Sequence, residues 1–275
     1  DFTTCVRFSD RGSCEVKAGR FILRRDMDVA TIFEVVCGDP IPDVGEPLTI
    51  SPGWRVREID AALAEQGLIQ PGEYLALVTR PKGFEAPYPL PTDTLEGYLY
   101  PETYMVNLSK WDTREFIQRQ IDLLTTQFYE PNREALDEAK ASGRDFGRIV
   151  IMASMLEKEE PKAENRPLVS GIIWKRLDEG WKLGIDATSR YTLEDWSDRK
   201  AFLKKLRDPS DPYNTRLRQG LPPTAIGNPT LSALEAALEP TDSPYWYYLH
   251  DKDKNLHPAK DSRGHEANRR TYNVY

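Results

Sequence analysis

One segment constrains the fold more than any other. Residues 146–160 read FGRIVIMASMLEKEE and are the most apolar stretch with helical periodicity in the chain. Apolar side chains recur there at i, i+3, i+4 and i+7, on one face of an α-helix: Ile149, Met152, Ala153 and Leu156. Because such a face must be covered, we expect the core to form around this helix.

Glu157 is the candidate catalytic residue of this helix. At about 100° per residue it lies on the edge of the apolar face, next to Val150 and Ala153. A carboxyl group placed there loses hydration, which raises its pKa. A glycosidase acid needs this, with a pKa raised from about 4.3 toward about 6. The alternative is a solvated helix end made of the charged residues 157–160, and composition alone favours that alternative.

Two further segments carry polar groups that suit a saccharide. In LGIDATSRY (183–191), Asp186 can orient a sugar hydroxyl or the catalytic glutamate, or it can simply cap a helix. Residues 211–229 contain four prolines and two glycines, which predicts a rigid loop, and loops of that length are usually functional or disordered. Three residues of this loop offer hydrogen bonds to hydroxyl and acetamido groups: Tyr213, Asn214 and Thr215.

The histidines and glycine motifs exclude several classes of site. The three histidines are His250, His257 and His265, and their spacing matches no helical metal-binding pair. We therefore expect no metal, and interpret them as substrate contacts or surface residues. No G-x-S-x-G and no phosphate-binding glycine loop occurs, which argues against an α/β-hydrolase or a nucleotide enzyme.

The net charge and the cysteines indicate which binding partners and which cellular compartment suit the chain. The net charge of −7 argues against a nucleic-acid partner. No apolar run reaches the roughly 18 residues of a membrane span, and because the chain starts at Asp1 we expect that an upstream segment has been removed. A Cys5–Cys14 disulfide across residues 10–13 and three free thiols (with Cys37) are both open. A disulfide would place the chain outside the cytoplasm.

The chain is predicted to be α+β, with a small region at residues 1–92 and a larger one at 93–275. Strands are expected at 21–23 and 47–50, a turn at 51–53 and a linker at 83–91. Helices are expected at 29–36, 55–67, 111–128 (capped by Asp112 or Thr113), 133–142, 146–160, 166–179 and 230–239.

Five segments together resemble the YceG-like endolytic murein transglycosylases (the MltG family). They are LEGYLYPETY (95–104), ASMLEKE (153–159), LGIDATSRY (183–191), YNTRLRQGLPPTAIGNP (213–229) and HPAKDSRGHEAN (257–268). They occur in the family's order over roughly residues 45–270. The chain departs from the family where a Gln-Ser-Asp-Pro-Thr run is replaced by residues 184–188, so a polar side chain is lost at Gly184. Pro52-Gly53 also stands where the family often has Glu-Gly.

The resemblance implies a fold and a set of site residues. Residues 1–92 would be an accessory LysM-like region, shortened here, and residues 93–275 a mixed α+β transglycosylase domain with a long Pro-rich active-site loop. Glu157 would be the single acid/base catalyst, without cofactor or metal. The implied substrate-binding residues are Glu96, Ser154, Asp186, Thr188, Tyr191, Tyr213, Asn214, Thr215, Leu221, Pro222, Pro223, Asn228, His257 and His265.

The implied reaction is a lyase reaction on nascent glycan strands, which leaves 1,6-anhydro-N-acetylmuramic acid ends and limits strand length. The implied partners are peptidoglycan and cell-wall synthases. The implied location is extracytoplasmic, with a membrane anchor that this chain lacks. Two alternatives stay open. One is a muramidase that uses Asp186 as a second carboxylate beside Glu157; the other is a non-catalytic glycan-binding or scaffolding module, which the change at Gly184 favours.

Overall fold

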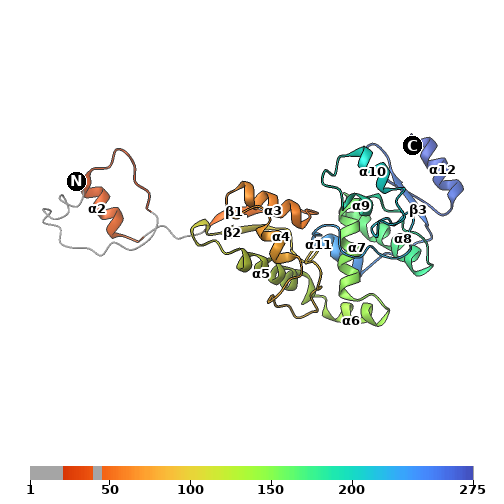
Figure 1. Ribbon diagram of the computed structural model, residues 1–275, viewed down its shortest axis with the longest axis horizontal. Helices are drawn as coiled ribbons and strands as arrows, with labels where there is room; N and C mark the ends of the chain where they lie inside the picture. Colours follow the sequence, from red (N-terminus) through yellow and green to blue (C-terminus); the bar gives the residue numbers. More distant parts are fainter. Residues whose placement is uncertain (1–20, 40–44, 275) are drawn as a thin grey trace. The chain divides into compact units, whose positions relative to one another are not determined.

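The computed structural model describes residues 21–39 and 45–274, and in them helices predominate over short strands (Figure 1). The α+β class is therefore confirmed. The chain forms two compact units, one of residues 1–48 and 104–111 and the other of residues 49–103 and 112–275. The predicted division at residue 92 does not coincide with a boundary between these units. As a division between an accessory and a catalytic region it stays a prediction.

The described part of the first unit contains the helix α2 (Val29–Cys37), which Asp28 caps by accepting a hydrogen bond from Thr31 N at 2.7 Å. Strand β1 (Glu46–Thr49) pairs with β2 (Thr103–Val106), and the short helix η1 (Leu108–Lys110) follows. The strand predicted at 21–23 is wrong. Ile22 and Leu23 are 68% and 50% exposed and lie in irregular backbone, because three apolar residues without a paired neighbour leave a strand's backbone groups unsatisfied.

Cys37 is disulfide-bonded, so the interpretation of three free thiols is wrong. The proposed partners Cys5 and Cys14 lie outside the described residues.

The second unit holds most of the elements. Its helices are α3 (Val56–Glu65), α4 (Glu73–Val78), α5 (Thr113–Leu124), the π-helical turn η2 (Thr125–Tyr129), α6 (Arg133–Ala141), α7 (Phe146–Glu159), η3 (Ala163–Asn165), α8 (Arg166–Asp178), α9 (Asp186–Arg190), α10 (Arg199–Lys205), α11 (Leu231–Leu238) and α12 (Ser262–Thr271). Strands β3 (Tyr247–His250) and β4 (Leu256–Ala259) pair antiparallel, with Tyr247 opposite Ala259.

The helices predicted in this unit are confirmed to within two residues at most ends. Asp112 caps α5 by accepting from Arg114 N and Glu115 N, as one of the two predicted caps. Asp145 caps α7 in the same way through Arg148 N, at 2.9 Å. A cap side chain satisfies backbone N–H groups that the first helical turn leaves unpaired, which fixes where each helix begins.

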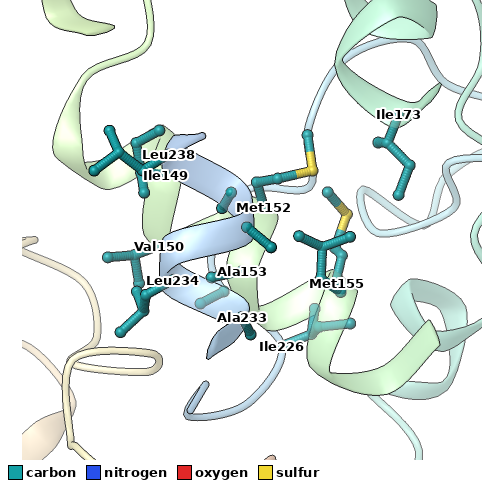
Figure 2. Packing of buried hydrophobic residues seen from close by; sticks show 14 of the residues in the cluster. Ile149, Val150, Met152, Ala153, Met155, Ile173, Ile226, Ala233, Leu234 and Leu238 are labelled. Atoms are coloured by element: carbon teal, nitrogen blue, oxygen red, sulfur yellow. The ribbon is translucent and has the colours of Figure 1, made fainter. Parts of the chain in front are cut away.

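Helix α7 forms the centre of the core, with α11 packed along it (Figure 2). The four residues of the predicted apolar face are all fully buried, and so are Val150, Ser154 and Met155 on other sides of the helix. The helix is therefore covered on more than one face, by α11 and by residues such as Ile173 and Ile226 (Figure 2). Each fully buried large apolar side chain contributes about 1.5–3 kcal/mol, so the position of α7 is firmly fixed. Among the described residues, no helix combines the length and apolar character needed to cross a membrane.

Candidate active site

The carboxyl-terminal turn of α7 carries two glutamates that face different surroundings. Glu157 and Glu159 are two residues apart, which is about 200° around a helix. Glu157 faces the starts of α8 and α11, where Arg166 and Thr230 lie. Glu159 faces α9 and β3, where it interacts with Asp186 and Tyr248. Only one of the two can therefore take part in chemistry on a given side of the helix.

Glu157 is held by hydrogen bonds to both of its carboxylate oxygens. Oε1 accepts from the Arg166 guanidinium at 3.0 Å. Oε2 accepts from Thr230 N at 2.9 Å and from Thr230 Oγ1 at 2.5 Å. The side chains of Glu157 and Arg166 are only 8% and 7% exposed. The predicted loss of hydration is confirmed, and the alternative of a solvated helix end is wrong for Glu157. Its surroundings are polar, however, because the tertiary fold brings a cation and a helix amino terminus to the carboxylate.

Arg166 extends this cluster into a junction between three helices. Its guanidinium also donates to Thr230 Oγ1 at 2.7 Å, to Ser232 Oγ at 2.8 Å and to the Glu160 carbonyl oxygen at 3.0 Å. That carbonyl is one of the groups left unpaired at the end of α7. The Glu157 carboxylate, in turn, lies at the amino terminus of α11, where the helix dipole favours a negative charge. The junction therefore fixes the last turn of α7, the turn that carries Glu159.

Glu159 is half-buried, at the last position of α7. Burial, followed by the negative charge of Asp186, raises the pKa of its carboxyl group to about 7. The Tyr248 hydroxyl donates a hydrogen bond to Glu159 Oε2 at 3.4 Å. A carboxyl group with a pKa near 7 still holds its proton in much of the population at neutral pH, as a general acid requires.

A network between the start of α9 and the loop at 211–229 places Asp186 beside Glu159. Thr215 Oγ1 accepts from Ile185 N at 3.0 Å and lies 3.0 Å from Thr188 Oγ1, whose hydroxyl donates to the Ile185 carbonyl at 2.7 Å. Thr188 and Thr215 are both buried, so their hydroxyls serve the fold. The next residue, Arg216, then pairs with Asp186 at 2.6 Å. Asp186, Thr188 and Thr215 are predicted from the sequence as sugar contacts, and of these three only Asp186 interacts with Glu159.

Glu96 is buried and is the centre of a second polar cluster. Its carboxyl group accepts from Val56 N at 3.2 Å and from the Tyr191 hydroxyl at 3.1 Å. Asn228 Nδ2 lies 3.4 Å from Glu96 Oε1, and Asn228 Oδ1 accepts from Gly97 N at 2.9 Å. Burial raises the pKa of Glu96 to about 8. Three of the predicted site residues, Glu96, Tyr191 and Asn228, therefore do meet. Their hydrogen bonds connect residues 54–56, 96–99 and 228.

The raised pKa of Glu96 predicts a pH dependence of stability. In the unfolded chain the carboxyl group releases its proton near its ordinary value of 4.5, while in the folded chain it releases it near 8. The stabilisation from this group is thus full below about pH 4.5 and is lost as the pH rises to about 8. As the pH rises from 5 to 8, we expect the free energy of unfolding to fall less for Glu96→Gln, which mimics the protonated form, than for the wild type. Thermal unfolding at several pH values measures this, and equal slopes for the two proteins would contradict it.

The other predicted residues near this region have structural partners. Ser154 Oγ donates to the Ile151 carbonyl at 2.7 Å and accepts from Ile226 N at 3.0 Å. The Tyr213 hydroxyl lies 2.9 Å from Thr224 Oγ1. Asn214 Nδ2 donates to the carbonyls of residues 205 and 208. Leu221 is half-buried, Pro222 buried and Pro223 exposed. Residues 211–229 contain neither helix nor strand, and these hydrogen bonds anchor them along their length.

His257 and His265 lie on the carboxyl-terminal elements β4 and α12. His257 Nε2 is 2.9 Å from Asp251 Oδ2, and the ring of His257 stacks on Tyr272 at 3.6 Å. His265 stacks on Tyr247 at 5.3 Å, and burial lowers its pKa. No contact that we find among the described residues joins either histidine to Glu157 or Glu159. Within the same residues, no group of three or more histidine, cysteine or acidic side chains is arranged to hold a metal.

Sequence reasoning overlooked Glu159, Arg166, Arg216 and Tyr248. The spacing of Glu157 and Glu159 can be read from the sequence, but the residues that contact them cannot. These are Arg166, Thr230 and Tyr248, which lie 9 to 89 residues further along the chain. A useful signal was available in the helix itself. Two glutamates separated by about 200° face different surroundings, and this spacing indicates Glu159 as a candidate beside Glu157.

Comparison with known proteins finds relatives at modest identity. The sequence model of the YceG-like family matches residues 1–271. The endolytic murein transglycosylase of Bacillus subtilis (strain 168) is 25% identical over 276 residues, which cover 95% of this chain and 74% of that protein. The endolytic murein transglycosylase of Streptococcus pneumoniae serotype 2 (strain D39 / NCTC 7466) is 25% identical over 178 residues, which cover 63% of this chain and 31% of that protein.

The fold also has a solved counterpart. A crystal structure of a YceG-like protein from Listeria monocytogenes matches with a TM-score of 0.69 at 25% identity. The match covers 88% of this chain and 81% of that one.

Proposed function

The chain belongs to the YceG-like family, and from its site we propose that it is a lytic transglycosylase that cuts the glycan strands of peptidoglycan. The observation that carries the proposal is the place of Glu159, which is half-buried at the end of the central helix and accepts a hydrogen bond from Tyr248. A pKa raised to about 7 supports the same role. Relatives named endolytic murein transglycosylase support the reaction and the substrate.

In the first step, Glu159 donates its proton to the glycosidic oxygen between N-acetylmuramic acid and N-acetylglucosamine. The bond from that oxygen to C1 of the muramyl sugar breaks, and positive charge develops at C1. The carboxylate that forms on Glu159 carries the opposite charge. A raised pKa suits this step, because the proton is available at neutral pH and leaves at little cost.

In the second step, the Glu159 carboxylate takes the proton from the C6 hydroxyl of the same muramyl sugar. The C6 oxygen then bonds to C1, which gives a 1,6-anhydro end and restores the acid. A retaining hydrolase needs a second carboxylate about 5.5 Å away, and an inverting one needs a held water. Attack within one sugar needs neither, because the nucleophile is already tethered to the reacting carbon. One carboxyl group therefore serves both steps.

The neighbours of Glu159 shift the pKa of its carboxyl group. Asp186 raises its pKa, while the Arg216 guanidinium and the Tyr248 hydroxyl lower it. Glu157, the residue predicted as the acid, remains the competing proposal. Its carboxylate already accepts from Arg166 and twice from Thr230, which suits a positioning residue that holds the end of α7.

The proposed acid predicts a pH profile. Activity requires protonated Glu159 in the free enzyme, so kcat/KM is expected to fall about tenfold per pH unit above pH 7. Asp186→Asn removes the nearby negative charge that raises this pKa. The decline of kcat/KM in this variant, the falling limb of its pH profile, is therefore expected at lower pH. Rates measured on isolated glycan strands between pH 5 and 9 provide the test. A falling limb that stays in place in Asp186→Asn would contradict the electrostatic role of Asp186.

Product analysis in ¹⁸O-labelled water tests the reaction itself. A lytic transglycosylase leaves anhydro-muramyl ends without ¹⁸O, whereas a muramidase leaves reducing ends that carry it. The sequence predicts a muramidase that pairs Asp186 with Glu157, and that pair stays a proposal. A second form of this alternative pairs Asp186 with Glu159, because the charge of Asp186 raises the pKa of Glu159. Reducing ends with ¹⁸O would move the assignment to that hydrolase. No cleavage of any strand would leave the non-catalytic, glycan-binding alternative.

The finer parts of the assignment are proposals on the same basis. We propose cleavage within nascent strands, which limits their length, at an extracytoplasmic site beside cell-wall synthases. Residues 1–92 would act as a LysM-like accessory region, and the protein would work at the membrane surface. The Pro-rich loop at 211–229 would border the path of the strand, together with those predicted contacts that are not buried, such as Tyr213, Leu221 and Pro223.

A further inference from the structure

A hollow of about 540 Å³ lies beside the carboxyl-terminal turn of α7. Two tryptophans, Trp54 and Trp196, line it together with Lys158, the residue between the two glutamates of α7. The remaining lining comes from one face of α3: Glu58, Ala61, Ala62 and Glu65. The hollow therefore combines two indole rings with a small apolar surface and a few charged groups.

Trp54 is held in place through its backbone. Its carbonyl oxygen accepts from Asn228 N at 3.0 Å and from Asn228 Nδ2 at 2.9 Å. The turn that precedes it lies against α7, because a side chain at Gly53 would come within 3.2 Å of Lys158 Nζ. Gly53 also has a φ of +71°, which favours glycine.

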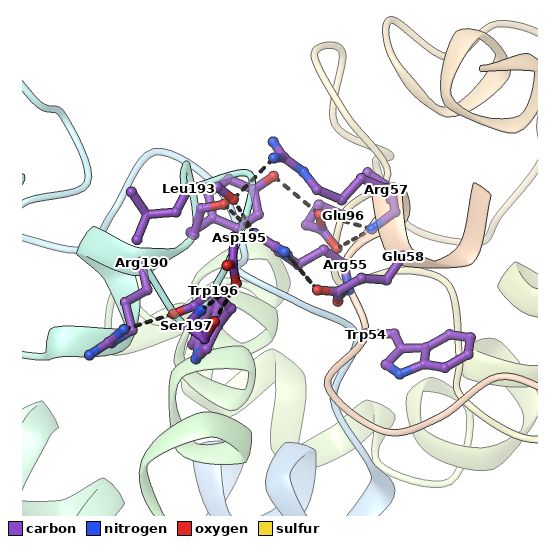
Figure 3. A network of polar contacts seen from close by, with 12 residues as sticks. Trp54, Arg55, Arg57, Glu58, Glu96, Arg190, Leu193, Asp195, Trp196 and Ser197 are labelled. Atoms are coloured by element: carbon purple, nitrogen blue, oxygen red, sulfur yellow. Dashed lines mark hydrogen bonds and ion pairs between the residues drawn. The ribbon is translucent and has the colours of Figure 1, made fainter. Parts of the chain in front are cut away.

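Trp196 is held by three cationic side chains. Its carbonyl oxygen accepts from Arg190 at 2.7 Å. Its ring lies 5.4 Å from the Arg55 guanidinium and 4.8 Å from Lys158 Nζ. Figure 3 shows Trp54, Arg55 and Trp196 with the polar network around them.

Arg55 makes this wall rigid. It is buried, and its guanidinium pairs with Glu58 at 2.6 Å. It also donates to the carbonyls of Tyr191 and Leu193 at 2.9 and 2.8 Å. A ring that packs on a guanidinium held by four hydrogen bonds loses little freedom when a ligand binds, which favours affinity. The Trp196 wall is thus preorganised, and Asn228 fixes the backbone of Trp54.

The charges around the hollow balance. Arg55 neutralises Glu58 through their ion pair, which leaves Lys158 and Glu65 with opposite signs. Burial lowers the pKa of Lys158. A ligand with a net charge gains nothing from such a surface, whereas a neutral ligand finds both hydrogen-bond donors and acceptors. The C–H face of a pyranose ring fits an indole, because the aromatic face is negative and the ring hydrogens are positive.

We propose that this hollow is a subsite for one neutral, N-acetylated pyranose of the glycan strand, with Trp54 and Trp196 as its walls. The subsite rests on the proposed function, since it serves the strand that Glu159 cuts. Lys158 would donate to a hydroxyl or acetamido oxygen of that sugar. Lys158 belongs to the last turn of α7, which also carries the proposed acid, so the subsite would hold a sugar of the strand near that turn.

Binding of chitotetraose, a neutral tetramer of N-acetylglucosamine, tests the subsite by titration calorimetry in the Glu159→Gln protein. We expect Trp54→Ala and Trp196→Ala to weaken binding about tenfold or more, as loss of an aromatic stacking surface typically does. Ala61→Arg fills the hollow from an exposed helix position without removing any contact, and we expect the same loss. Trp181→Ala is the matched control, because Trp181 is 40% exposed and stacks on Trp246 elsewhere.

Cleavage kinetics separate this inference from the proposed function. In proteins that keep Glu159, the subsite predicts a raised KM for the three variants at nearly unchanged kcat. If all three variants bind chitotetraose as tightly as the wild type and have the same KM, the subsite is overturned. Cleavage of strands by the wild type would still uphold the proposed function. Binding of a free acidic stem peptide in place of chitotetraose would also overturn it. If no protein cleaves strands but chitotetraose binding still depends on both tryptophans, the function fails and the saccharide subsite stands.

Discussion

Replacement of Arg166 by methionine is expected to lower the free energy of unfolding by about 3–5 kcal/mol, the usual cost of removing one partner of a buried ion pair. The Glu157 carboxylate would stay buried without its countercharge. Hydrogen bonds to Thr230, Ser232 and the Glu160 carbonyl would be lost as well. At about 2–4 °C per kcal/mol for a chain of this size, the melting temperature should fall by roughly 6–20 °C. Thermal or denaturant unfolding measures the change.

An exposed arginine provides the matched control for this experiment. Arg270 pairs with Glu266 on the surface of α12 and its side chain is 75% exposed, so Arg270→Met should change stability by less than about 1 kcal/mol. The double variant Glu157→Gln/Arg166→Met removes the unpaired charge and should recover part of the loss. If Arg166→Met lowered the free energy of unfolding no more than Arg270→Met does, Arg166 would not stabilise the end of α7.

The second large effect concerns activity. Glu159→Gln keeps the size of the side chain but cannot donate or accept the transferred proton, so kcat is expected to fall by about 10³-fold or more. Stability should not suffer, because the amide resembles the protonated carboxyl group. Above pH 7 the variant should unfold at the same temperature as the wild type or higher, since the buried negative charge is gone. Glycan-cleavage rates and melting temperatures measured together provide the test.

Glu164→Gln is the control for this loss. Glu164 lies in η3, five residues further along the chain, and is exposed. Its replacement should leave kcat unchanged. Substantial turnover by folded Glu159→Gln would show that another group supplies the proton.

The long apolar elements of the fold were accessible from the sequence. The stripe of residues 149, 152, 153 and 156 predicted the central helix, and the position of Asp112 predicted where α5 begins. Helical periodicity and caps act locally, so they are visible in a short window. The strand predicted at 21–23 failed because a strand depends on a partner that local sequence does not specify.

Short elements escaped prediction for a related reason. Helices α9 and α10 span 5 and 7 residues, too few to show a periodic face. Strands β3 and β4 contain histidine, tyrosine and proline and are held by their mutual pairing. Their positions matter to the site, because α9 carries Asp186 and β3 carries Tyr248. The surroundings of Glu159 were therefore hidden from the sequence.

The roles of individual polar residues were the least predictable. Thr188 and Thr215 have the hydroxyls expected of sugar contacts, yet they lie 3.0 Å from each other in the buried interior. Glu157 is on the helix where the chemistry was expected, but Arg166 and Thr230 occupy its carboxylate. In both cases the partner is distant in sequence, and only the tertiary structure decides between a structural and a chemical role.

The most direct test compares Glu157→Gln and Glu159→Gln on isolated glycan strands, with mass spectrometry of the products at a temperature where both proteins are folded. The account predicts anhydro-muramyl products from the wild type, none from Glu159→Gln, and reduced but measurable amounts from Glu157→Gln. Abundant anhydro products from Glu159→Gln together with none from folded Glu157→Gln would contradict it and make Glu157 the acid.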